Sequence, residues 1–166
     1  LVREGSVSYP CAGADVPGAD VVFENGFPTP SGRAGFVPAA LLPPDEQPSG
    51  EYPLILSTGR LLEHWHTGAM SRRSATLDAL EPEAVVTVSD EDLRRLGIAD
   101  GERVRLSTRR GAIEATARAD PAVAPGSLWL PFCFHEAAAN RLTNPVLDPF
   151  GKIPEFKYCA VRLERA

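Results

Sequence analysis

The stretch from Thr58 to Arg73, TGRLLEHWHTGAMSRR, concentrates residue types that bind ligands rather than fill a core. It contains three arginines, two histidines and a tryptophan, and its apolar residues follow neither the strand period nor the helix period. Arginine offers phosphate a planar fork of donors, while indole and imidazole offer flat faces and ring N–H groups to a heteroaromatic ring. Gly59 and Gly68 allow the main chain to approach a ligand closely. This mixture predicts a large, anionic, heterocyclic ligand.

A second polar stretch, residues 131–144, follows a short apolar run near the end of the chain. The amides of Asn140 and Asn144 can donate and accept hydrogen bonds at once, which suits the edge of a nitrogen heterocycle. Asn144 precedes a proline, and an Asn-Pro pair favours a turn, so its structural interpretation is the simpler one. Lys157 could be an ordinary surface lysine.

Two other kinds of protein remain open at this point. His64 and His66 are two residues apart and would share one face of a strand, and with His135 they could form the three-histidine set of a catalytic zinc site. The alternative is a purely structural or partner-docking barrel, in which the 58–73 segment is ordered and packed without any ligand.

The composition bounds the class of protein. With 166 residues and 43% hydrophobic residues the chain suits one domain with a core. Its net charge of -5 and pI near 5.2 argue against nucleic acid as the main partner. No apolar run approaches the roughly 20 residues that a membrane-spanning helix needs, so we expect no membrane insertion. The chain begins with Leu1, and its one methionine is Met70, which predicts a piece of a longer protein.

The three cysteines are far apart in the sequence. Cys11, Cys133 and Cys159 lack the spacing of zinc or iron–sulfur ligands and are too few for a disulfide-rich secreted domain. Cys133 lies between two phenylalanines and is expected to pack in the core. Three free thiols in a reducing cytoplasm is the simplest interpretation, so we expect a cytoplasmic location.

The elements that position these stretches follow from the hydrophobic pattern. Residues 1–50 hold half of the prolines and half of the glycines, which predicts an irregular arm with short strands such as Val21–Phe23, and a linker from Pro43 to Gly50. Beyond it, strands are expected at 52–56, 84–88, 102–108, 112–119, 127–130 and around residues 161–163, with a helical turn at 76–80 and a helix at 90–96. Ser89 is the expected N-cap of that helix and Gly97 its end. Short strands separated by turns predict a mainly β protein, a compact barrel rather than a doubly wound sheet.

The run TGRLLEHWHTGAMSRR, preceded by EYPLILS, closely resembles the cofactor-binding segment at the start of the C-terminal domain of molybdopterin-dinucleotide oxidoreductases. That family contains formate dehydrogenases and nitrate reductases. Residues 27–34, FPTPSGRA, residues 131–144 and the ending IPEFK resemble it as well. The resemblance implies a double-psi β-barrel with a few short helices at 51–166, and an irregular arm from the preceding domain at 1–50.

The resemblance also implies the residues of a site. No catalytic residue and no metal ligand is expected in this piece, and the residue matching Phe132 faces the substrate. We expect Arg60, and less directly Arg72 or Arg73, to neutralise a pyrophosphate, and Gly59 to allow close backbone approach. The full set of implied cofactor-binding residues is Thr58, Gly59, Arg60, Leu61, Leu62, Glu63, His64, Trp65, His66, Thr67, Asn140 and Lys157.

The function implied by the resemblance is that of a molybdenum or tungsten oxidoreductase that binds molybdopterin guanine dinucleotide. The ending and the run FCFHEAAAN look more like formate dehydrogenases, which oxidise formate to carbon dioxide, than like nitrate reductases. An iron–sulfur cluster is expected in the parent chain, outside this piece, and the expected partners are the preceding catalytic domains and an electron-transfer subunit. The piece is expected to be inactive alone.

Overall fold

A computed structural model describes residues 5–6, 8–13, 16 and 18–166 of the chain. The chain divides into two compact units, Leu1–Leu42 and Pro43–Ala166. The described part of the first unit contains no helix and no strand, in keeping with its proline and glycine content. Residues 43–50, a linker by composition, belong to the same unit as the residues that follow them.

The strand expected at Val21–Phe23 is wrong, because the chain turns there. Phe23 has a left-handed backbone conformation, with φ of 63°, and its carbonyl accepts a hydrogen bond from the amide of Gly26 at 3.1 Å. Its ring stacks on Phe27 with 5.1 Å between the ring centroids. A turn closed by these local contacts replaces a strand that has no neighbour to pair with in the described part of this unit.

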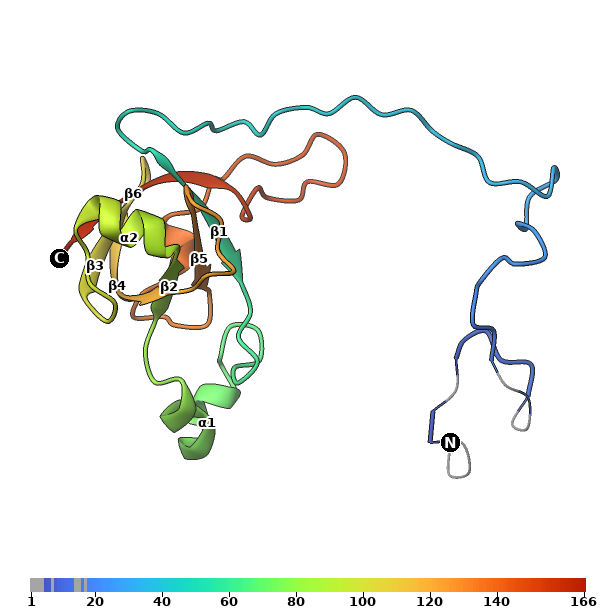
Figure 1. The fold of residues 1–166 in the computed structure, drawn as a ribbon, viewed down its shortest axis with the longest axis horizontal. Coiled ribbons are helices and arrows are strands. Elements are labelled where there is room, and N and C mark those ends of the chain that lie inside the picture. Colours follow the sequence, from blue (N-terminus) through green and yellow to red (C-terminus); the bar gives the residue numbers. More distant parts are fainter. Residues whose placement is uncertain (1–4, 7, 14–15, 17) are drawn as a thin grey trace. The chain divides into compact units, whose positions relative to one another are not determined.

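The second unit is a closed barrel with the strand order β1-β5-β2-β4-β3-β6 (Figure 1). The pairs β1·β5 and β2·β4 are parallel, and the other neighbouring pairs are antiparallel. The mainly β barrel predicted from the sequence is confirmed, and it agrees with a double-psi barrel. The strands are β1 (Leu54–Gly59), β2 (Val85–Val88), β3 (Arg103–Ser107), β4 (Ala112–Ala119), β5 (Ser127–Pro131) and β6 (Cys159–Arg165).

The core of the barrel follows from alternation along its strands. In β3, Val104 and Leu106 are fully buried while Arg103 and Arg105 are exposed, as the sequence pattern predicts. The same alternation appears in β4, where Ala115 and the other inward residues are buried. The fully buried large side chains of the barrel include Leu54, Leu56, Leu106, Leu128, Leu130, Val86, Val88, Val104, Val161 and Phe134.

Helices are few and short in the described residues: α1 (Ala75–Leu80), α2 (Asp90–Leu96), and two single 3₁₀ turns, η1 (Ser71–Arg73) and η2 (Ala139–Arg141). The bounds of α2 match the prediction. Ser89 accepts a hydrogen bond from the amide of Asp92, and Gly97 ends the helix with φ of 66°. None of these helices is long and apolar enough to cross a membrane.

Strand pairing brings the two polar stretches to one end of the barrel. The parallel strands β1 and β5 are in register, with Gly59 opposite Pro131, so both strands deliver the chain to the same end. Strand β6 runs the other way and begins there, with Cys159 opposite Leu56. The segments that follow β1, follow β5 and precede β6 therefore meet at this end.

Two of the cysteines are buried and are expected to be unreactive. Cys133 and Cys159 are buried, and loss of hydration raises the pKa of each thiol from 9.0 to about 11. A rise of this size lowers the thiolate fraction by about a hundredfold. We expect both cysteines to resist iodoacetamide at about pH 8, while they react fully in denaturant, as measured by peptide mass spectrometry. Equal labelling of the folded and unfolded protein would contradict this burial.

Candidate functional site: a groove at one end of the barrel

A groove of about 410 Å³ lies where the three segments meet. Its apolar walls come from two phenylalanines and two prolines, and its polar groups are hydroxyls, amides and one imidazole. No acidic side chain lines it. The lining residues are Thr58, His66, Thr67, Phe132, Asn140, Thr143, Asn144, Pro145, Pro154 and Phe156.

The end of β1 is tied to the segment that precedes β6. The hydroxyl of Thr58, which is almost fully buried, donates to the carbonyl of Phe156 at 2.8 Å. The ammonium of Lys157 donates to the carbonyl of Thr58 at 2.6 Å. Lys157 thus lies beside the groove without lining it, and these two bonds fix one wall against the other.

His66 and Phe132 form the floor contact between the first and second polar stretches. Their rings meet edge to face, with centroids 5.3 Å apart and planes at 69°, an arrangement that aromatic pairs favour. His66 has φ of 51°, a left-handed conformation that is uncommon outside glycine. Such strain is typical of functional positions, and His66 lines the groove.

His64, by contrast, is a core residue. It is fully buried, its Nε2 is 2.8 Å from the carbonyl of Glu81, and its ring meets that of Phe134 edge to face at 5.6 Å. Because a carbonyl oxygen only accepts, Nε2 donates this hydrogen bond, and the buried Nδ1 finds no hydrogen-bond partner in the described residues. His64 therefore anchors the 58–73 segment to the residues after α1 instead of lining the groove.

Most of the other residues between Thr58 and Thr67 lie outside the groove. Arg60, Leu62 and Trp65 are exposed, whereas Leu61 and Glu63 are half-buried. Leu62 and Trp65 expose apolar surface, 97% and 67% of the residue respectively.

Gly59 has a structural reason to be glycine. A Cβ at this position would lie 2.2 Å from Nε1 of Trp129 on the neighbouring strand. Gly59 thus accommodates an indole of the barrel itself, which the sequence alone did not reveal.

Arg72 is committed to contacts within the protein. Its Nη1 is 2.7 Å from a carboxylate oxygen of Glu136 and its Nε is 3.1 Å from one of Asp78, while its guanidinium lies 4.7 Å from the ring centre of Phe134. The hydrogen bond to Glu136 raises the pKa of Arg72 more than burial lowers it. Arg73 is exposed. Arg72 therefore orders the segment, whereas the side chains of Arg60 and Arg73 are exposed to solvent.

The second polar stretch contributes two asparagines. Asn140 is exposed in η2 and lines the groove. Asn144 is buried, its side-chain oxygen accepts from the amide of Val146 at 3.2 Å, and its side-chain nitrogen donates to Glu155 at 2.7 Å. The turn role expected for Asn144 is confirmed, and the residue lines the groove as well.

Sequence reasoning considered Asn144 but preferred a turn role for it, and it missed four lining residues: Thr143, Pro145, Pro154 and Phe156. Strand pairing could have identified Pro154 and Phe156. Strand β6 begins beside the end of β1, so the residues that precede β6 must lie at the groove.

The three histidines do not form a zinc site. His64 is in the core, His66 packs on Phe132, and His135 is 93% exposed with Nδ1 3.1 Å from Glu136. Within the described ranges no group of three or more His, Cys, Asp or Glu side chains is arranged to hold a metal ion.

The donor set fits a flat nitrogen heterocycle. Phe132 and Phe156 supply ring faces and edges, and Asn140, Thr67 and Thr143 supply groups that can both donate and accept. Pockets for organic cofactors combine apolar walls with a few convergent polar groups in this way. The exposed Arg60 and Arg73 belong to the 58–73 segment, and their charges suit an anionic part of such a ligand.

Comparison with known proteins gives a family match. Residues 54–160 match the model of the family described as "Molydopterin dinucleotide binding domain". This range includes all six strands in whole or part and all residues of the groove.

Curated relatives extend the match to almost the whole chain. The F420-dependent formate dehydrogenase 1 subunit alpha of Methanococcus maripaludis is 39% identical over 157 residues, 95% of this chain and 23% of the relative. The periplasmic nitrate reductase of Desulfovibrio desulfuricans is 32% identical over 181 residues, 100% of this chain and 24% of the relative. The chain thus spans about a quarter of the length of these proteins.

A solved structure has the same fold. The acetylene hydratase of Pelobacter acetylenicus aligns with a TM-score of 0.64 over 70% of this chain and 19% of that chain. At 19% sequence identity this likeness concerns the fold alone.

Proposed function

The chain belongs to the molybdopterin dinucleotide binding domain family, and from this premise we propose that its groove holds molybdopterin guanine dinucleotide in a formate-oxidising molybdenum or tungsten enzyme. The observation that carries the proposal is the convergence of three segments on one groove, in which two aromatic rings face amide and hydroxyl groups. The preceding catalytic domains, with their iron–sulfur cluster, and an electron-transfer subunit are the proposed partners.

Four groove residues and the exposed Arg60 have a proposed role toward the cofactor. Asn140 and Thr143 would hold the edge of a ring system, and His66 with Phe132 would pack against its face. Arg60 would pair with a phosphate, for which its planar guanidinium is suited. When bound, the cofactor supplies the metal and the sulfur ligands for two-electron chemistry, while the protein positions it and shapes its electrostatics.

Lys157 would act on the cofactor through its charge, because its ammonium is bound to the groove wall. Its ammonium is held 2.6 Å from the Thr58 carbonyl, so it places a positive charge beside the groove. That charge would favour the anionic cofactor and stabilise added negative charge on it. Phe132 would face the substrate end, where an apolar ring excludes water.

Formate is the favoured substrate because of the names of several relatives. F420-dependent formate dehydrogenase alpha subunits of Methanococcus maripaludis and Methanocaldococcus jannaschii are 38–39% identical to this chain. Nitrate reductases with 32% identity from Desulfovibrio desulfuricans and 39% from Symbiobacterium thermophilum make nitrate the second candidate.

The test is an assay of the full-length enzyme, purified with its cofactor. We expect formate-dependent reduction of an electron acceptor, molybdenum or tungsten by elemental analysis, and release of a guanine nucleotide on denaturation. Nitrate reduction without formate oxidation would show that the proposed substrate is wrong, while the proposed cofactor would stand. Absence of both metals and of the nucleotide would overturn the proposal.

The His66→Ala variant of the full-length enzyme tests the groove directly. Loss of one aromatic contact corresponds to roughly two- to tenfold weaker retention of the cofactor, measured as guanine nucleotide per protein after gel filtration. His135→Ala is the matched control, because His135 is 93% exposed and lies outside the groove. Equal nucleotide content in both variants would count against the role of His66.

A further inference from the structure

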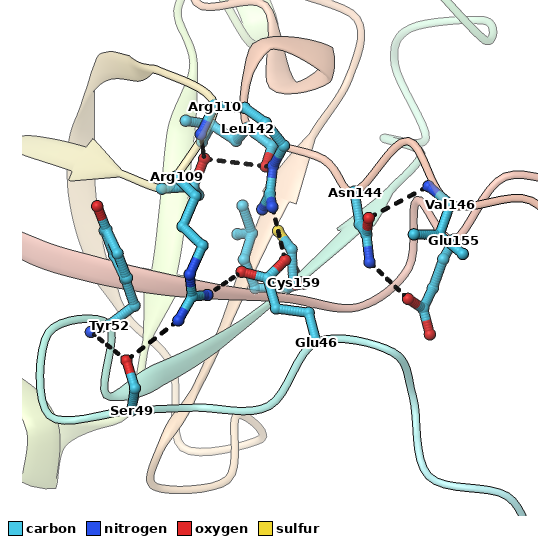
Figure 2. A network of polar contacts seen from close by, with 12 residues as sticks. Glu46, Ser49, Tyr52, Arg109, Arg110, Leu142, Asn144, Val146, Glu155 and Cys159 are labelled. Carbon is cyan, nitrogen blue, oxygen red and sulfur yellow. Dashed lines mark hydrogen bonds and ion pairs between the residues drawn. The ribbon is translucent and has the colours of Figure 1, made fainter.

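A buried carboxylate joins the segment before β1 to the turn between β3 and β4 (Figure 2). Glu46 is only 8% exposed. Its Oε1 lies 2.5 Å from Nη1 of Arg109, and its Oε2 lies 2.7 Å from Nη1 of Arg110. Glutamate is almost never buried to this extent unless it is paired. The two neighbouring guanidinium groups supply the compensating charge.

The two arginines have different tasks. Arg109 also donates to the hydroxyl of Ser49 at 3.4 Å and lies 4.9 Å from the ring centre of Tyr52. Both contacts are in the segment that carries Glu46, so Arg109 fastens that segment to the barrel.

Arg110 reaches in the other direction, toward the groove. Its Nε donates to the carbonyl of Leu142 at 2.9 Å, and the hydroxyl of Thr108 donates to the same carbonyl at 3.1 Å. Arg110 therefore connects Glu46 to Leu142, as Figure 2 shows. Its Nη2 and Oε2 of Glu46 are buried atoms without a hydrogen-bond partner in the described residues, so Arg110 and Glu46 are joined as an ion pair that compensates both charges.

Leu142 stands directly before two lining residues of the groove. Its side chain is fully buried in the core and its carbonyl accepts two hydrogen bonds, so its backbone is fixed from both sides. Thr143 and Asn144 follow it and line the groove, and Asn144 is held in turn by Glu155. A displacement of the Leu142 carbonyl would carry this wall with it.

A second observation shows how closely the turn and the groove segment are packed. A Cβ at Gly111, next to Arg110, would lie 3.1 Å from the carbonyl oxygen of Arg141. That distance leaves little room for the turn to move without moving the chain at Arg141 and Leu142.

We propose that Glu46 is a positioning residue for the groove. Through Arg110 it fixes the Leu142 carbonyl and thereby places Thr143 and Asn144 against the cofactor. The proposal rests on the proposed function for the identity of the ligand, but its mechanical part concerns the protein alone. Without the carboxylate, the guanidinium of Arg110 would be left with an uncompensated charge and would turn toward water, which would release Leu142.

The experiment compares Glu46→Gln with Glu51→Gln in the full-length enzyme. Glu51 is an exposed glutamate of the same segment, 4.0 Å from Arg162, and serves as the matched control. Loss of one hydrogen bond to Leu142 predicts roughly two- to tenfold faster amide exchange at Thr143, Asn144 and Val146 in Glu46→Gln. Less guanine nucleotide per protein is expected as well, with neither change in Glu51→Gln.

The outcomes separate positioning from simple stabilisation. A lower melting temperature of Glu46→Gln with unchanged amide exchange at Thr143, Asn144 and Val146 and unchanged nucleotide content would overturn the proposal. If Glu46→Gln does not fold, Arg110→Lys takes its place, because lysine keeps a charge for Glu46 but lacks the second donor for Leu142. Faster exchange in an enzyme whose wild type releases no nucleotide would support the coupling and overturn the proposed function.

Discussion

The Gly59→Ala substitution is expected to lower the free energy of unfolding by about 1–3 kcal/mol, the usual cost of overpacking. The added Cβ would lie 2.2 Å from Nε1 and 2.6 Å from Cε2 of Trp129, well inside van der Waals contact. Trp129 is in β5, the parallel neighbour of β1, and is in register with Ser57. Either the indole or the end of β1 must move. Because Thr58 lies at this end, we expect cofactor content to fall together with stability, as measured by denaturant unfolding and nucleotide release.

Gly50→Ala is the control for the intrinsic effect of the substitution, since a Cβ at Gly50 would meet nothing within 4 Å. Adding Trp129→Phe to Gly59→Ala replaces the indole by a smaller ring, so the double variant should recover part of the loss. Full stability of Gly59→Ala would contradict the close packing of the two strands.

The ends of β1 and β5 and the start of β6 explain why one groove can collect residues that lie about a hundred positions apart. The parallel register of Gly59 with Pro131 and the antiparallel register of Leu56 with Cys159 fix three chain segments at one end of the barrel. Short bonds between backbone and side chains, such as Lys157 to the Thr58 carbonyl, then set the width of the groove. The ends of these strands therefore fix where the irregular segments that line the groove begin and end.

Much of the barrel was predictable because its signals are local. Alternation at Val104 and Leu106, the N-cap at Ser89 and the left-handed glycine at Gly97 each act over a few residues, and the structure confirms all of them. The pairing of strands is not local, and an alternating pattern does not say which strand is the neighbour. The resemblance to a known family implied the class of barrel, and the order of its strands became known only from the structure.

The groove was harder to predict because its residues lie on irregular chain. His64 and His66 have the same side chain and are two residues apart, yet one packs in the core beside Phe134 and the other lines the groove. The two residues differ in backbone conformation, because His66 is left-handed, and the residue type alone does not predict this. Arg72 likewise has the charge expected of a residue that binds phosphate, but its guanidinium already forms ion pairs with Asp78 and Glu136. The sequence does not show that these two carboxylates lie beside it.

Glu46 could not have been found from the sequence. It stands in a proline-rich stretch that composition assigns to a linker, and its partners are more than 60 residues away. Only the approach of the β3–β4 turn makes a buried carboxylate possible there.

Asp92→Asn is expected to lower the free energy of unfolding by about 2–3 kcal/mol near neutral pH, the scale of hydrogen bonds to a charged group. Asp92 is 2% exposed, and its carboxylate accepts from the amide of Gly126 at 2.6 Å, from Ser89 at 2.9 Å and from Arg95 at 2.5 Å. It thus ties helix α2 to the start of β5. Asp90→Asn, at an exposed position in the first turn of the same helix, is the control and should cost at most about 1 kcal/mol.

The carboxylate of Asp92 also makes the free energy of unfolding depend on pH in a predictable direction. Burial raises the pKa of Asp92, but hydrogen bonds from Arg95, Gly126 and Ser89 outweigh burial and hold the pKa below its ordinary value of 3.8. A group with a lowered pKa in the folded state stabilises the protein above its unfolded-state pKa and loses that contribution as the pH falls through the folded-state pKa. The stability gap between the wild type and Asp92→Asn should therefore be constant from neutral pH down to about 4 and shrink below it, as urea unfolding at a series of pH values would measure. A gap that widens as the pH falls would mean that Asp92 is not held as a carboxylate by these donors.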